Sequence, residues 1–133
     1  MHSLRQRINA REESGFTLIE LLVVLVIIGV LLAIAVPSYL GFKDRAQQTA
    51  AASDVRSAIP SAEAFYSDNN TYNAISVAAL KTYDAGLSAD IKDVKVESGG
   101  NGYCIAAQVG NWWSHVVGPG GVIATKETAD NCP

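Results

Sequence analysis

The chain has few of the residues that build catalytic or metal centres. Its 133 residues include only two cysteines and two histidines. We find no nucleophile–base–acid set and no phosphate-binding loop, so we expect a protein that is not an enzyme and needs no cofactor or metal. Charged residues make up 17% of the chain and its net charge is −3. Binding of nucleic acid through phosphates requires clustered lysines and arginines, so the charge argues against nucleic acid as a strong direct ligand.

Charge is also missing from one long segment. Residues 21–42 contain no charged side chain, and the 16 residues from Leu21 to Val36 are apolar apart from Gly29. A helix of about 20 apolar residues crosses a bilayer. This segment is apolar all round, whereas a soluble helix is apolar along one stripe. Three arginines precede it and favour a cytoplasmic N-terminus. The sequence therefore predicts one membrane-inserted helix.

Two kinds of processing fit this N-terminal region. In the first, the apolar run is a secretory signal peptide that is cut after Ala35, because residues 33–35 follow the small-x-small rule, and a soluble chain begins at Val36. In the second, a charged leader ends at Gly15, and Glu20 is a lone carboxylate inside the apolar helix. Such a carboxylate costs about a few kcal/mol in lipid, which suggests a function for it.

The segment Gly15-Phe16-Thr17-Leu18-Ile19-Glu20, with the apolar run, Pro37 and Tyr39 after it, resembles the N-terminus of type IV pilins and their pseudopilin relatives. The close match covers residues 15 to about 39. The resemblance implies that a membrane-embedded aspartyl peptidase cuts the Gly15–Phe16 bond and methylates the new amine of Phe16. It also implies three parts: a leader peptide (1–15), a hydrophobic transmembrane or filament-core helix (16–42) and a globular head (43–133).

The resemblance gives Phe16 and Glu20 a role in assembly. In the family, the glutamate of one subunit is thought to neutralise the amine of its neighbour, and a buried charge is tolerated when it is paired. The alternative is a protonated Glu20 that forms only a local hydrogen bond. Pro37 and Gly41 are the expected positions of a helix kink, because a proline removes a backbone hydrogen bond.

Beyond the apolar segment the sequence predicts an amphipathic helix that continues to about Tyr66. Its apolar residues recur at helical spacing, and Pro60 should kink it or begin a new segment. The turn-forming cluster 67–71 should end it. Ser76 could cap a short helix that ends at Gly86. The predicted apolar stripe comprises Val55, Ala58, Ile59, Ala62, Phe65 and Tyr66.

The C-terminal third predicts a small antiparallel sheet. Strands are expected at 93–97, 103–109, 112–117 and 122–125, separated by glycine-rich turns. In the first strand, Val94 and Val96 should face the core. The helix at 43–66 should cover the sheet, so the expected fold class is α+β with a long N-terminal helix packed on a small sheet, as in pilins.

The only cysteines are Cys104 and Cys132. An exported domain of this size benefits from a covalent staple, and pilins commonly close their C-terminal region with one, so the resemblance implies a disulfide. Two free thiols, or a metal site with His115, are the alternatives. Trp112 and Trp113 should point to opposite faces of a strand, one into the core and one into solvent.

Three aspartates, Asp84, Asp90 and Asp93, could suggest calcium, which some pseudopilins bind. Their spacing matches no calcium loop that we can defend, so a solvated acidic surface is the preferred interpretation.

Taken with the resemblance, the sequence predicts a filament subunit. It would first lie in the inner membrane and then in an extracellular type IV pilus used for motility, adhesion or DNA uptake. The implied partners are identical subunits, the prepilin peptidase, the pilus assembly machinery and, before assembly, the membrane. A pseudopilin of a type II secretion system is the second hypothesis, and a soluble domain secreted after cleavage at Ala35 is the third.

Overall fold

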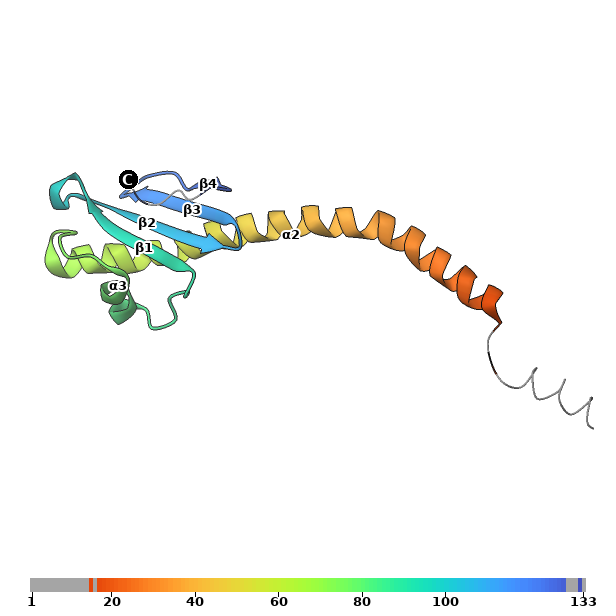
Figure 1. The fold of residues 1–133 in the computed structure, drawn as a ribbon. Coiled ribbons are helices and arrows are strands. Elements are labelled where there is room, and N and C mark those ends of the chain that lie inside the picture. The colour runs from red at the N-terminus through yellow and green to blue at the C-terminus, as the bar shows by residue number, and fades with distance from the viewer. Residues whose placement is uncertain (1–14, 16, 129–131, 133) are drawn as a thin grey trace, which may run out of the picture. The chain divides into compact units, whose positions relative to one another are not determined.

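A computed structural model describes residues 15, 17–128 and 132 of the chain. The first long element is helix α2, Leu18–Asn69, which has 52 residues (Figure 1). Its residues belong to two compact units that divide between Leu40 and Gly41. The helix assignment runs without a break through Pro37, Gly41 and Pro60. Pro60 therefore does not begin a new helical segment, and its side chain is exposed.

The first unit contains the apolar part of α2. Every side chain from Leu18 to Leu40 is exposed, including those of the large aliphatic residues. Leu25 and Ile34, for example, are 66% and 71% exposed. Among the described residues, α2 is the one helix that is long and apolar enough to cross a membrane. This matches the predicted membrane helix in length and composition.

The second unit is the head, and its sheet is a simple meander. Four antiparallel strands lie in the order β1-β2-β3-β4, and a short helix α3 precedes them (Figure 1). The order confirms the predicted meander and the α+β class. The last strand is shorter than expected and begins two residues later. The bounds are α3 Val77–Tyr83, β1 Ile91–Glu97, 3-10 helix η1 Ser98–Gly100, β2 Gly102–Val109, β3 Trp112–Gly118 and β4 Ala124–Lys126.

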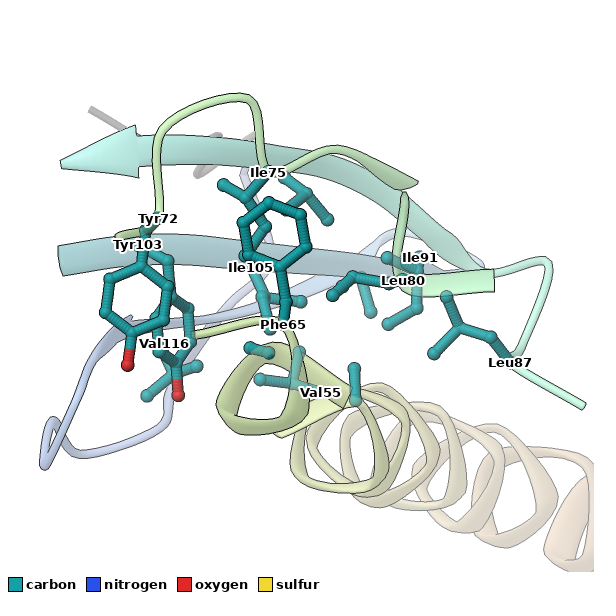
Figure 2. Packing of buried hydrophobic residues seen from close by; sticks show 14 residues of the cluster. Val55, Phe65, Tyr72, Ile75, Leu80, Leu87, Ile91, Tyr103, Ile105 and Val116 are labelled. Carbon is teal, nitrogen blue, oxygen red and sulfur yellow. The ribbon is translucent and has the colours of Figure 1, made fainter. Parts of the chain in front are cut away.

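The core of the head lies between the C-terminal part of α2 and one face of the sheet (Figure 2). Val55, Ala58, Ala62 and Phe65 of the predicted stripe are buried, and Ile59 is partly buried. Helical spacing places Tyr66 in the stripe, but it is 40% exposed. The core is completed by Tyr72, Ile75, Leu80, Leu87, Ile91, Val94, Tyr103, Ile105, Ala107 and Val116.

The end of α2 and the start of α3 follow the sequence signals. Helix α2 ends at Asn69, whose side-chain amide donates to the carbonyl of Phe65, and Asn70 adopts a positive φ of 57°. Ser76 caps α3 by accepting the backbone N–H of Ala79 at 3.1 Å. Asp84 follows the last helical residue, so α3 ends before the predicted Gly86.

Strand β1 begins two residues earlier than predicted and contains a bulge at Lys92. The pairing of Ile91 with Ala107 and of Asp93 with Ala106 leaves one extra residue, Lys92, on β1. A bulge shifts the side chains beyond it by one position. Ile91 and Val94 therefore both reach the core although they are three positions apart. Val96, which the alternation places on the core face with Val94, is 43% exposed, and the bulge does not account for this because it precedes both valines.

Strand β2 is buried on both faces. Tyr103, Ile105 and Ala107 belong to the core beneath α2, and Cys104 and Ala106 form a second cluster on the opposite face. Cys132 covers this second cluster through a disulfide to Cys104, with the two Cα atoms 5.6 Å apart. The disulfide thereby fixes Cys132 onto the middle of the sheet.

The two tryptophans do not divide into one buried and one exposed residue. Both are partly buried, and Trp113 packs against the cluster of Cys104, Ala106 and Cys132. The expectation of one core and one solvent-facing tryptophan is wrong because Cys132 and the cluster it joins cover part of the outer face, which strand periodicity alone does not reveal.

Candidate functional site

The N-terminal end of α2 carries the residues that the sequence singles out for processing. Gly15 is exposed, with a φ of +117°, and a Cβ placed on it would meet nothing within 4 Å. L-residues rarely adopt this conformation, so a side chain here would be strained even though there is space for it. Phe16 lies outside the described residues, so the structure does not test its predicted roles.

Glu20 lies in the first turn of α2, where Thr17 caps the helix. The Thr17 hydroxyl accepts the backbone N–H of Glu20 at 3.3 Å, and the Thr17 carbonyl accepts the N–H of Leu21 at 3.3 Å. The Thr17-x-x-Glu20 spacing is that of a capping box. A carboxylate in this turn also lies close to the positive end of the helix dipole. The local sequence thus fixes where the helix begins and places an acidic residue in its first turn.

The head holds no comparable chemical centre in the part of the chain that the structure describes. There, no three histidine, cysteine, aspartate or glutamate side chains come close enough together to hold a metal. The disulfide uses both sulfur atoms, so Cys104 and Cys132 are neither free thiols nor metal-binding thiolates.

The three aspartates considered for calcium have separate structural roles. Asp84 accepts the backbone N–H of Gly86 at 2.9 Å, and the backbone carbonyl of Asp90 accepts the N–H of Gln108. Asp93 pairs with Lys95 at 3.2 Å. The side chain of Asp90 instead approaches Asp54, a residue that the sequence gives no reason to select. Burial, and then the charge of Asp90, raise the pKa of Asp54.

A second polar cluster also escapes prediction from the sequence. The hydroxyls of Tyr72 and Tyr103 both donate to the carboxylate of Glu63, at 3.3 Å each. The rings of Tyr72 and Tyr103 lie 4.9 Å apart, and Tyr66 lies 4.7 Å from Tyr72. Burial, followed by the charge of Glu63, raises the pKa of both bonded tyrosines. These contacts connect α2 to β2 and hold the head together.

Comparison with known proteins identifies the N-terminal segment. The family described as "Prokaryotic N-terminal methylation motif" matches residues 10–36. The type IV wide pilus major component PilA4 of Thermus thermophilus is 30% identical over 130 residues, which cover 92% of this chain and 99% of that protein.

Two other relatives extend the comparison. The type IV major pilin protein PilA of Myxococcus xanthus is 39% identical over 67 residues, half of this chain but only 30% of that pilin. The type II secretion system core protein G of Escherichia coli is 28% identical over 90% of this chain and 91% of its own length. The chain therefore belongs to the family of type IV pilins and type II secretion pseudopilins.

Proposed function

We propose that this chain is the structural subunit of a type IV pilus. The observation that carries the proposal is the match to the Thermus wide pilus component, which extends over nearly the whole of both chains. The exposed apolar helix agrees with it, because side chains from Leu18 to Leu40 find no burial within one chain. Neighbouring copies would bury them in the filament, as lipid would before assembly.

Processing would divide the chain into the leader 1–15, the helix 16–42 and the head 43–133. The prepilin peptidase would cut the Gly15–Phe16 bond and methylate the amine of Phe16. The methylation motif spans this bond, and Gly15 is exposed at the start of the apolar helix. The kink at Pro37 and Gly41 stays a prediction.

Assembly would pair the amine of Phe16 with Glu20 of a neighbouring subunit. Thr17 fixes the backbone of Glu20 in the first turn, so its carboxylate remains near the end of the helix where that amine would lie. Because both charges would be buried in a low-dielectric bundle, each is stable only with its partner. The subunit would begin in the inner membrane and end in an extracellular filament for motility, adhesion or DNA uptake, with the assembly machinery moving it between them.

A pseudopilin of a type II secretion system is the second candidate, and the near-full-length match to the Escherichia coli core protein G favours it. Secretion of a soluble domain cut after Ala35 has less support. The methylation motif includes residues 33–35, and a signal peptide has no use for Glu20.

The first test is intact mass spectrometry of protein sheared from producing cells. We expect a chain that begins at Phe16, one methyl group heavier than calculated and two hydrogens lighter because of the disulfide. Recovery of the same processed chain only with the cells would favour the pseudopilin. A chain that begins at Val36 would refute the processing proposed here.

The second test separates the two states considered for Glu20. The Glu20→Ala variant should be processed normally and yield no filaments. The Glu20→Gln variant keeps the shape and local hydrogen bonding but lacks the charge, so it should fail in the same way. Normal filament yield from Glu20→Gln would show that a protonated, locally bonded Glu20 is sufficient, and the pairing would then be abandoned.

A further inference from the structure

The head has a shallow groove between α2 and the end of α3. Its volume is about 350 Å³, within the range of ligand-binding clefts. One wall comes from the exposed side of α2, and the other from the residues that end α3. The groove is lined by Ser57, Pro60, Ser61, Ala64, Tyr83 and Asp84.

The chemistry of the groove fits a long basic side chain. Pro60 and Ala64 supply apolar surface for an aliphatic stem, and Asp84 supplies a carboxylate for its charged end. Tyr83 is 39% exposed, and its hydroxyl is held by Asp68 at 2.9 Å. An aromatic ring and a carboxylate close to one apolar surface are favourable for a guanidinium group.

Charged residues are distributed unevenly along the head, and this also favours a basic side chain in the groove. Between residues 57 and 90 there are four carboxylates and one lysine, whereas the basic side chains of this part of α2, Lys43, Arg45 and Arg56, all precede residue 57. Lys43 and Arg45 are exposed at the beginning of the head. Within the described part of the chain, neither forms an ion pair.

Arg45 cannot reach the groove of its own chain. Ser57 is the lining residue of α2 nearest to Arg45, and the two are 12 residues apart, which is about 18 Å along the helix at about 1.5 Å per residue. The basic and acidic surfaces are therefore available to different copies. A contact between two different surfaces of identical chains is head-to-tail, and repetition of such a contact builds a helical filament.

We propose that the groove at Ser57–Ala64 and Tyr83–Asp84 receives Arg45 of a second copy of this chain. The inference rests on the proposed function, since only an assembled subunit has such neighbours. Arginine suits the site better than Lys43 does, because its planar guanidinium binds a carboxylate through two parallel hydrogen bonds. The contact would join heads, whereas Glu20 acts in the apolar helix.

Charge reversal in cells that produce the full chain tests the contact. Asp84→Lys and Arg45→Glu should each lower the amount of sheared filament at least tenfold, and the double variant should restore at least half of it. Lys92→Glu is the matched control: Lys92 is exposed on β1, outside the groove, so its reversal should leave the yield unchanged. Lys43→Glu should reduce the yield less than Arg45→Glu does.

Asp84 also accepts a backbone N–H within the head, so loss of folding must be excluded. The Asp84→Asn variant retains an acceptor and lacks only the charge. It should keep the trypsin resistance of the wild-type head and still yield several-fold less filament. A normal yield from Asp84→Asn together with a normal yield from Arg45→Glu would overturn the proposal.

Cross-linking gives a reading that does not depend on filament yield. Chains with both Ala46→Cys and Ala64→Cys keep Arg45 and Asp84, and they should form dimers and longer ladders with a short bis-maleimide, because the two native cysteines are bonded to each other. Either substitution alone should give no ladder. Absence of the ladder while Glu20→Ala still abolishes filaments would refute this contact and leave the proposed function standing. Absence of filaments from the wild type would refute the proposed function and, with it, the contact, because only assembled subunits have such neighbours.

Discussion

The two units of the chain differ in whether their apolar side chains are buried within one copy. The segment from Leu18 to Leu40 is the most apolar part of the sequence, yet all of its side chains are exposed. The head has a more mixed composition and buries a continuous core between α2 and its sheet. The contrast shows that hydrophobicity alone does not determine burial within a chain. The head is complete in one copy, whereas the apolar helix requires lipid or other subunits.

Removal of the disulfide should give the largest change in the stability of the head. The bond joins residues 28 apart and covers the outer face of β2. Replacement of both cysteines by serine should cost about 3–4 kcal/mol of unfolding free energy. Both tryptophans lie in β3, so tryptophan fluorescence during denaturation of the full chain in detergent reports on the head alone. An unchanged midpoint would show that the covering of β2 does not stabilise the head.

A matched pair of leucine substitutions tests the comparison directly. Leu80 is fully buried and Leu25 is 66% exposed. Leu80→Ala should destabilise the head by about 3 kcal/mol, through lost burial and the cavity that remains. Leu25→Ala should leave the same unfolding curve unchanged. Equal effects of the two substitutions would mean that the apolar helix and the head unfold as one cooperative unit.

Alkaline pH should weaken the head by a smaller amount and leave the apolar helix intact. Burial, and then the charge of Glu63, raise the pKa of Tyr103, so the folded head keeps a proton that the unfolded chain loses near pH 10. The neutral Tyr103 side chain therefore contributes to the free energy of unfolding below about pH 10. This contribution is lost as the pH rises toward the folded-state pKa, by at most about 1.4 kcal/mol per pH unit for one tyrosine.

The Tyr103→Phe variant measures that contribution. Its unfolding free energy should fall less steeply than that of the wild type between about pH 9 and pH 11, on either side of the ordinary tyrosine pKa. Residues 21–38 contain no ionisable side chain, so the helical circular dichroism of the apolar segment should not change over the same range. Parallel slopes for the wild type and Tyr103→Phe would contradict the proposed linkage.

Local signals in the sequence predict much of this structure. The apolar run, the serine cap at Ser76, the asparagine-rich end of α2 and the glycine-rich turns are each continuous in the sequence, and the helices, helix end and sheet turns that they predict are confirmed. Errors arise where distant segments decide the outcome. The bulge at Lys92 depends on how β1 pairs with β2, and the partial burial of Trp113 depends on the cluster of Cys104, Ala106 and Cys132.

The residues of the candidate sites also fall into those that are close in the sequence and those that only the fold brings together. Gly15, Thr17 and Glu20 lie within six residues of one another, so their pattern is visible in the sequence. The contacts of Glu63 with Tyr72 and Tyr103, and the groove at Asp84, bring together residues that are 9 to 40 positions apart or on separate helices. Nothing in the spacing of these residues indicates that they meet.

The two turns that flank β3 differ in how much they would tolerate inserted peptide. The β2–β3 turn has two residues, and a side chain at Gly110 would collide with Gln47 of α2. An epitope placed there would have to displace the end of the Gln47 side chain and would put side chains at a position with a φ of +60°. The β3–β4 connection is longer, and Val122 in it is 88% exposed. A short affinity tag inserted between Gly121 and Val122 would remain accessible to antibody on the folded head, which makes this connection the preferred place to label the subunit.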